Sequence, residues 1–546
     1  MSTIYLNGEI YTGNTAQPWA EAIWVSDGRI RAVGTARDLQ DLSGGAEQVD
    51  LQGRMVMPGI HDAHLHLLFS GLKFTYEARL SPGADAEQII EDLRNCQCSG
   101  PTDRHGNQWI IGGEFMPANF THGVDNHHLS EAFPETPVFL YDYSIHHGLA
   151  NARALELAGL ESGQPPETPG GRFLRDSTTG QLTGELVEQA TWPVQSAIPD
   201  YTEDVYLDAV NWAVQQCNQY GITSVQEASA SPQALAAFKT LDSRKQLKVR
   251  VAAHLVWREE GFGMATAAEL EALIADRHAW ASPHVDTSFI KIWLDGAPLP
   301  PHCTQSDLLE DEIDESKILV PQSELIEALA KFDSDGLQVK IHCAGEGAIR
   351  AALNAIEQVR KRNGAGGPSH ELAHAGFISE ADYPRLAELD VIAEMSPALW
   401  HIPEFGLQDG FRFKSVLSHH AKLTVGSDWI VLPSPNLFPG LQGMLEHGPH
   451  SVDLATALEA VTVAGARAVG KEDIQGTLEP GKSADFIVLD RNLFKIPISD
   501  IGTTRVEMTV FEGDVVYRSE PTINDHLGAA AGPSPAASPE QEYRAT

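Results

Sequence analysis

Short apolar runs alternate with amphipathic helical segments through the middle of the chain. Apolar positions in 204–219, 323–334, 346–361 and 452–469 repeat near every 3.6 residues, the period of a helix with one buried face. Together with the apolar run at 55–57, eight candidate strands result, the others being 223–225, 249–253, 289–294, 338–342, 371–374, 391–394 and 423–426. Such alternation is typical of parallel βα units, so the pattern predicts an α/β fold built on a (β/α)8 TIM barrel.

Both ends of the chain have a different pattern, in which short strands are separated by tight turns. Asn7-Gly8 follows an apolar run near the N-terminus, and this dipeptide is a strong hairpin signal. Near the C-terminus, 484–489 and 506–511 are further candidate strands. Because both ends are rich in strands and the middle is not, we expect one small β-domain built from the two ends.

These patterns set the expected domain boundaries. We predict a composite β-sandwich from residues 1–57 and 476–524, with the barrel at 58–475 between its two parts. Residues 525–546 are rich in Ala, Pro, Gly, Ser and Glu and are expected to be a disordered tail. A large insertion after the first strand, at about 72–203, breaks the rhythm of the barrel. It is expected at the C-terminal face, either as a lid over a pocket or as a subdomain without a role in activity.

Composition narrows the class of protein. Asp and Glu number 75 against 38 Lys and Arg, a formal charge of −37, so a nucleic acid partner is not expected. The five cysteines form an odd and sparse set, which indicates no disulfide framework and favours a reducing compartment. The sequence has neither a signal-peptide pattern nor an apolar run of about 18 residues. We therefore expect a cytoplasmic protein without a membrane partner.

Candidate chemistry begins at His64-Leu65-His66. Side chains two positions apart on an extended chain point to the same side, and neutral imidazole is a common metal ligand. Alone, the pair is weak evidence for a metal site, because such a motif more often consists of polar residues in a loop. Other polar residues lie at or near the ends of further candidate strands, namely Lys291, His342, His374 and Asp428. Because strand ends meet at one face of a barrel, the sequence predicts that these residues share a site.

In this order, the motifs resemble the amidohydrolase superfamily and its YtcJ-like branch, which includes N-substituted formamide deformylases. The resemblance covers about residues 2–520, and its segments are 58–66, 221–225, 291–297, His342, His374, 426–428 and 476–485. It implies a metal-dependent hydrolase on a (β/α)8 barrel with a composite β-sandwich. One departure concerns 369–374, which reads Ser-His-Glu-Leu-Ala-His where relatives carry Arg-His-Arg-Ile-Glu-His.

The resemblance also implies roles for the candidate residues. His64 and His66 would hold one divalent ion and His342 and His374 a second, with zinc as the default metal. Lys291, carboxylated by CO2, would bridge the two ions. If Lys291 is instead part of a structural ion pair, the site would hold one metal. Asp428 would bind the first metal or its water, take the proton of the nucleophile and pass it to the leaving amine.

Three further residues are substrate candidates. His146 falls in a segment that resembles a family segment near the substrate, so it is a candidate catalytic residue for carbonyl polarisation and a candidate for substrate binding. Trp400 and His401 follow the seventh candidate strand and are expected to line the pocket. Glu188 lies in a recurring segment whose role the sequence does not define.

We therefore predict a hydrolase that cleaves a C–N bond of a small amide, N-acyl, N-formyl or cyclic amide compound, and not a peptide bond, by metal-activated hydroxide. One alternative is a mononuclear deaminase of the same superfamily, which the number of metals per chain would distinguish. Another is a binding or regulatory protein that retains the fold without turnover. Dimers are common for folds of this kind, so a homodimer is the assembly considered.

Overall fold

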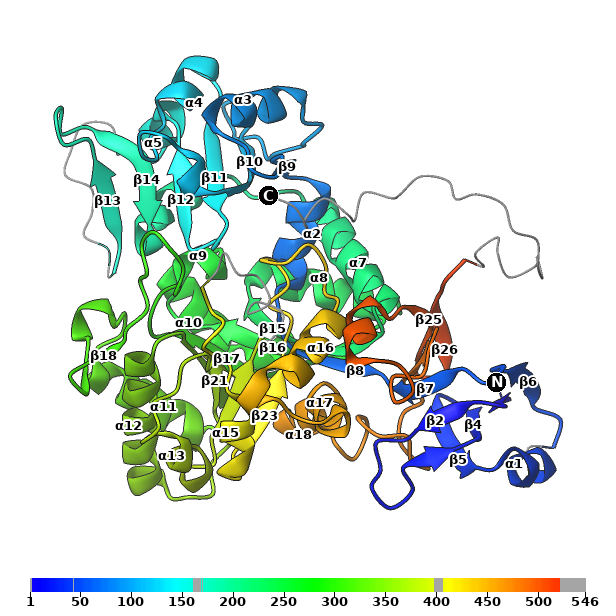
Figure 1. The fold of residues 1–546 in the computed structure, drawn as a ribbon. Helices are drawn as coiled ribbons and strands as arrows, with labels where there is room; N and C mark the ends of the chain where they lie inside the picture. Colours follow the sequence, from blue (N-terminus) through cyan, green and yellow to red (C-terminus); the bar gives the residue numbers. More distant parts are fainter. Residues whose placement is uncertain (1, 43, 161–167, 169, 397–405, 521–546) are drawn as a thin grey trace.

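A nearly closed barrel of eight parallel strands forms the centre of the protein (Figure 1). The computed structural model describes residues 2–42, 44–160, 168, 170–396 and 406–520. The barrel strands, in order around the sheet, are β8 (Ile60–Leu65), β15 (Ile222–Ala230), β16 (Arg250–Val256), β17 (Val285–Trp293), β20 (Gln338–Cys343), β21 (Glu371–His374), β22 (Ile392–Met395) and β23 (Lys422–Val425). The last strand returns to the first, where Asp428 N donates to His64 O at 2.7 Å. The sheet agrees with the predicted TIM barrel.

Helices on the outside of the barrel connect successive strands. The long ones are α7 (Glu203–Gln219), α8 (Pro232–Ser243), α11 (Gln322–Ser334) and α12 (Glu346–Asn363). The start of α8 has a clear local cause, since the Ser231 hydroxyl accepts from Ala234 N at 3.2 Å and Pro232 stands at the first helical position. The predicted helix at 452–469 is two helices, α17 (Leu454–Ala460) and α18 (Val463–Ala468).

The first barrel strand begins later than the sequence pattern suggested. The apolar run at 55–57 belongs to β7 (Met55–Pro58), which pairs with β24 (Phe486–Leu489) and β2 (Glu9–Tyr11) in a sheet outside the barrel. The chain crosses into the barrel at Gly59, where an added Cβ would collide with Thr223. Assigning the run at 55–57 to the barrel was therefore wrong, because apolar character alone does not tell which of two adjoining sheets a strand joins.

Strands from the two ends of the chain share one sheet. Its order is β26-β25-β24-β7-β2-β3, and a second sheet has the order β5-β4-β1-β6. The strands not yet defined are β1 (Ser2–Leu6), β3 (Trp19–Ala20), β4 (Ala22–Ser26), β5 (Arg29–Gly34), β6 (Glu47–Asp50), β25 (Val506–Phe511) and β26 (Asp514–Arg518). One buried cluster draws residues from both ends, including Ile10, Val56, Phe486 and Val510. The predicted tail at 525–546 lies outside the described residues.

The insertion after β8 and α2 (Leu67–Thr75) is a folded unit with its own core. Its sheet has the order β13-β14-β12-β11-β10-β9, and α3 (Ala86–Asn95), α4 (His127–Ala132) and α5 (Ala152–Leu157) lie beside it. The strands are β9 (Ala78–Arg79), β10 (Ile110–Phe115), β11 (Val138–Asp142), β12 (His147–Ala150), β13 (Arg172–Arg175) and β14 (Leu182–Val187). Two separate apolar clusters are buried in this unit, one around Leu140 and the other around Phe139. Figure 1 shows the unit on the α2 side of the barrel, away from the terminal sheets.

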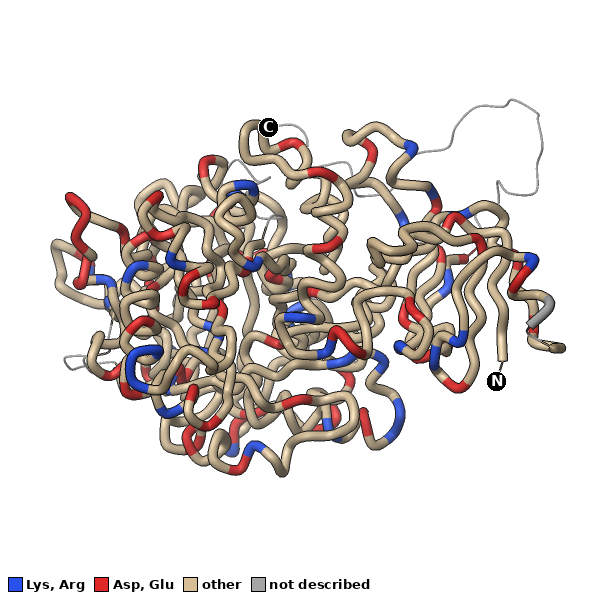
Figure 2. The backbone as a smooth tube through the Cα atoms, turned by 90° about the horizontal axis from the view of Figure 1, so that it is seen from below, with Lys and Arg blue, Asp and Glu red and all other residues tan. Residues whose placement is uncertain are grey.

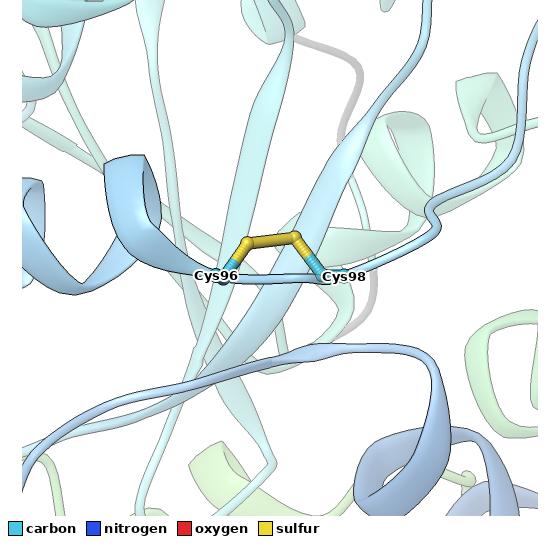
Figure 3. The surroundings of a disulfide bond; sticks show 2 residues. All are labelled: Cys96 and Cys98. Atoms are coloured by element: carbon cyan, nitrogen blue, oxygen red, sulfur yellow. A yellow bond between two sulfur atoms is a disulfide. The ribbon is translucent and has the colours of Figure 1, made fainter.

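Cys96 and Cys98, which follow α3, form a disulfide (Figure 3). The cysteine count did not predict this bond, because parity says nothing about two thiols that are close neighbours in the chain. The cysteine count therefore no longer supports the inferred reducing compartment.

Acidic positions are spread over the whole backbone tube in Figure 2. Every helix in the described ranges is too short or too polar to span a bilayer.

Candidate metal centre

His64 and His66, the two histidines of the His64-Leu65-His66 motif, both lie close to the carboxylate of Asp428. His64 is near the end of β8, and His66 directly precedes α2. Nε2 of His64 lies 3.7 Å and Nε2 of His66 3.6 Å from Oδ1 of Asp428. All three side chains are buried, and their donor atoms lie within 4.8 Å of one another. The structure thus brings together three of the predicted ligands from opposite ends of the barrel sequence.

The outer nitrogens of both imidazoles have partners of their own. Nδ1 of His64 lies 2.7 Å from Oε2 of Glu394, and Nδ1 of His66 lies 2.6 Å from Oγ of Ser229. Such contacts orient histidine ligands and leave the other nitrogen for the metal. Glu394 is the last residue of the candidate strand at 391–394, but no role was predicted for it. The sequence signal that could have identified Glu394 is its place at the end of an apolar strand, where the other predicted ligands also lie.

His374 and His342 lie on the other side of Asp428. The His374 ring stacks on that of His64, with centroids 4.6 Å apart, and its Nδ1 is 3.9 Å from Oδ2 of Asp428. His342 lies beside His374 at a centroid distance of 5.1 Å. Nε2 of His342 faces Asp295 Oδ1 at 3.7 Å. His374 is therefore close enough to His64 for both to bind one metal ion. His342 contacts His374 but is not a member of the group formed by His64, His66 and Asp428.

Lys291 is buried in β17 near this cluster. Burial, with a contribution from Lys340, lowers the pKa of its amine to about 7, although Glu394 and Asp428 act in the opposite direction. A substantial fraction of the amine is therefore uncharged near neutral pH, and only an uncharged amine reacts with CO2.

Asp428 occupies a tight loop after β23, with a φ of 52°. Gly426 precedes it where an added Cβ would collide with the His64 backbone, and Ser427 N donates to Asp62 Oδ1 at 2.9 Å. Burial favours the neutral acid, but His374, His66 and Lys291 outweigh it and lower the Asp428 pKa to about 2. The carboxylate is therefore charged at neutral pH. The close Gly426 contact explains why the motif begins with glycine.

The donor set fits a divalent metal. Burial lowers the pKa of His64, His342 and His374, that of His374 to about 4, so their imidazoles are neutral and have a lone pair to donate. Neutral imidazoles with one carboxylate suit zinc, and other divalent transition metals accept the same ligands. A second overlapping group, His64, His374 and Glu394, also has donor atoms within 4.8 Å. His61 is not part of either group, since its Nε2 faces Gln226 instead.

The insertion contributes His146 and Glu188 to the same site. His146, between β11 and β12, has its ring 5.3 Å from that of His342, and its Nδ1 lies 3.0 Å from Oε2 of Glu188. Glu188 is anchored in turn by Ala297 N at 3.2 Å. Burial opposes the charged forms of both groups, but their attraction prevails, so the His146 pKa is raised and the Glu188 pKa falls to about 2. The insertion therefore holds a protonatable imidazole beside the metal ligands.

Comparison with known proteins shows which family the chain resembles. A model of the amidohydrolase family matches residues 47–517. The chain belongs to the amidohydrolase family. It is 26% identical to the YtcJ protein of Bacillus subtilis (strain 168), over 95% of this chain and 99% of that protein. It is also 26% identical to the N-substituted formamide deformylase of Arthrobacter pascens, over 94% of this chain and 97% of that enzyme.

Solved structures share the fold of this amidohydrolase. A metal-dependent hydrolase from Pyrococcus horikoshii superposes with a TM-score of 0.70 at 23% identity, over 91% of this chain and 99% of that chain. A zinc-bound adenosine deaminase from Xanthomonas campestris gives a TM-score of 0.58 at 15% identity, over 94% and 92% of the two chains. At these identities the likeness concerns the fold alone.

The space around the ligands is narrow. A cavity of about 30 Å³ lies between the ligand histidines, Lys291, His146 and Phe262. Phe262 stacks on Trp293 with centroids 5.1 Å apart, and both rings line this cavity. Trp400 and His401, which the sequence suggested as pocket residues, lie outside the described residues.

Proposed function

We propose that this chain is a metal-dependent hydrolase that cleaves the C–N bond of a small amide, N-acyl, N-formyl or cyclic amide compound. The observation that carries the proposal is the convergence of His64, His66 and Asp428 within 4.8 Å, with both outer imidazole nitrogens already occupied. Membership of the amidohydrolase family and the similarity to a formamide deformylase support amide hydrolysis.

The site would hold two divalent ions, with zinc as the default. His64, His66 and Asp428 are the residues for one ion, and His342 and His374 for the other. Lys291, carboxylated on its uncharged amine, would lie between the ions as a negatively charged ligand. When bound, such ions lower the pKa of water and stabilise negative charge on a carbonyl oxygen.

Asp428 would carry out the proton transfers of the reaction, and His146 would bind the substrate carbonyl. Asp428 is charged at neutral pH and would accept the proton of the attacking water, then return it to the nitrogen of the departing amine. His146, held by Glu188, would donate a hydrogen bond to the substrate carbonyl. Because Glu188 raises the pKa of His146, the imidazole keeps a proton available for that bond at higher pH than a free histidine.

The small cavity favours a small substrate over a peptide. At about 30 Å³ the space among the ligands has room for little more than the reacting group itself. A solved Xaa-Pro dipeptidase shares the fold with a TM-score of 0.53 at 13% identity, which does not bear on the substrate. We therefore propose that this enzyme acts on bonds other than peptide bonds.

A mononuclear deaminase is the second candidate, and one observation favours it. Nε2 of His342 faces Asp295 at 3.7 Å and does not join either group of donors that lie within 4.8 Å of one another. If His342 keeps that partner in the working enzyme, a single ion shared by His64, His66 and Asp428 would remain.

The test measures metal and activity on the same protein. We expect two metals per chain by mass spectrometry, and hydrolysis of at least one member of a panel of formamides, N-acyl amines and cyclic amides. Asp428→Asn should lower kcat by about 100- to 10,000-fold at saturating metal, whereas the exposed control Asp409→Asn should not. One metal with release of ammonia from ring amines would favour the deaminase. A fully loaded protein without turnover would favour a binding protein.

A further inference from the structure

A second cavity of about 60 Å³ adjoins the metal centre at His342 and His374. It shares these two residues, together with His146 and Asp428, with the cavity that lies among the ligands. A substrate whose scissile bond lies at the metal centre can therefore place one of its substituents in this space. The chemistry of the second cavity then bears on which substituents are accepted.

The walls of this second cavity are apolar beyond the metal end. They are formed by loops that follow several barrel strands, with the side chains Pro298, Leu299, Phe377, Leu407, Phe411 and Val431. Leu299, Leu407 and Phe411 are almost fully buried, and Phe411 N donates to Gly376 O at 2.7 Å. That backbone hydrogen bond joins the loop after β21 to the segment before α15 (Phe413–Ser418), so two of the walls are held to each other.

The polar side chains of the cavity are gathered at its metal end. They are Ser144, His146, His342, His374 and Asp428. Among the described residues that line the cavity, none is a lysine or an arginine. A substrate carboxylate placed among the apolar walls would lose its hydration without gaining a lysine or arginine partner there. This loss of hydration disfavours an anion.

We infer that the substituent held in this cavity is a small uncharged hydrocarbon, so that this enzyme prefers amides with a short alkyl group over amides that carry a carboxylate near the scissile bond. The inference rests on the proposed function. It deepens that function by naming the substrate class. The cavity volume sets the size, since about 60 Å³ holds a few carbon atoms and not a long chain.

Matched substrates test the inference in the metal-loaded, full-length protein. On the amine side, N-isopentylformamide is compared with N-formyl-β-alanine, which has a carboxylate in place of the terminal isopropyl group. On the acyl side, N-methyl isocaproamide is compared with N-methylsuccinamate, which differs in the same way. In at least one pair, we expect the apolar member to be favoured by about 100-fold or more in kcat/KM. Equal rates, or preference for the carboxylates, would overturn the inference while leaving amide hydrolysis intact.

A variant of Phe377, in the wall of the second cavity, gives a second test of the inference. Phe377 is only partly buried, so Phe377→Arg can place a cation at the cavity with little risk to the core. We expect this variant to lose most of the preference for the apolar member, and the matched control Phe377→Leu to keep it. An unchanged preference in Phe377→Arg would contradict the assignment of this cavity.

Failure of the proposed function has a different signature. If the metal-loaded protein hydrolyses neither pair, the proposed hydrolase activity fails, and calorimetric binding of the same four compounds then decides the inference. Tighter binding of an apolar member than of its carboxylate partner would support an apolar subsite. Equal binding, or no binding by either pair, would overturn it.

Discussion

His64 and Glu394 form a buried pair in which Nδ1 of the imidazole lies 2.7 Å from the carboxylate, although the two residues are 330 positions apart. Burial raises the pKa of Glu394 to about 8, while Lys340 opposes the shift. Burial also lowers the pKa of His64, so a hydrogen bond joins a neutral imidazole to this carboxyl group. A divalent cation at Nε2 of His64 would favour the arrangement in which Nδ1 donates that hydrogen bond and Glu394 accepts it.

Glu394→Gln tests this pairing. The amide keeps the shape of the side chain but removes the negative charge, so His64 becomes a weaker ligand. We expect metal affinity to fall by about 10- to 100-fold, the usual effect of losing such an outer contact, as measured by competition with a chelator. The exposed control Glu388→Gln should bind metal as the parent protein does. Unchanged affinity in Glu394→Gln would show that the pair serves only packing.

Lys291→Ala tests the bridging role. We expect the variant to lose the second metal and most of the activity, because no other side chain would supply the charge between the ions. Metal per chain is the direct measurement, with the exposed Lys361→Ala as control. In the parent protein, adding bicarbonate during reconstitution should speed uptake of the second metal. Two metals retained in Lys291→Ala would exclude a bridging lysine.

Glu188→Gln tests the orientation of His146. Without the carboxylate, the Glu188 interactions that raise the His146 pKa disappear, and burial, which lowers this pKa, is opposed only by Asp142 and Glu259. We expect the alkaline limb of the kcat profile to move to lower pH, and His146→Asn to lose the limb with a drop of about 100-fold or more in kcat. The exposed control Glu135→Gln should leave the profile unchanged. If the limb does not move in Glu188→Gln, His146 is not the titrating group.

Lys340→Met should destabilise the barrel. Nζ of Lys340 lies 3.3 Å from Oε2 of Glu371, and both side chains are fully buried. Removing the cation leaves a buried carboxylate without its partner, at a cost of about 3–5 kcal/mol in the free energy of unfolding. Urea denaturation measures this loss. The double variant Lys340→Met with Glu371→Leu should recover much of it, and failure to recover would mean that the lysine acts through another contact.

His284 links the barrel to the terminal sheet and predicts a pH effect on stability. Its imidazole lies 3.3 Å from Glu512 and 2.7 Å from Asp242, and chiefly the Glu512 contact raises its pKa despite burial. The folded state thus holds this proton more tightly than the unfolded state. The stabilisation is fully present below the usual histidine pKa of about 6.5 and is lost as pH rises through the raised pKa.

The expected result for His284→Gln follows from that sign. The difference in unfolding free energy between the parent protein and the variant should be largest near about pH 6 and should shrink as pH rises. Chemical denaturation at a series of pH values measures it. The exposed control His105→Gln should show no such trend, and a difference that grows with pH would refute the linkage.

The sequence alone determined the barrel and the positions of its donors. Short apolar runs and period-3.6 patterns are local properties, so they are readable wherever strands and helices alternate, as at 338–361. Strand-end donors such as His64 and Asp428 were predicted to meet because parallel strands of a barrel end at one face. The roles of His342, Lys291 and His146 were implied by resemblance and stay predictions.

Only the tertiary structure decided which residues support those donors. Met55 and Val56 pair with a strand more than four hundred residues away, and the run is equally apolar whichever sheet it joins. Glu394 holds His64, and Glu188 holds His146, across distances in the chain that no periodicity spans. These partnerships depend on the order of strands around the barrel and on where the insertion lies over its mouth. Such long-range contacts form between elements, so a pattern within any single element does not contain them.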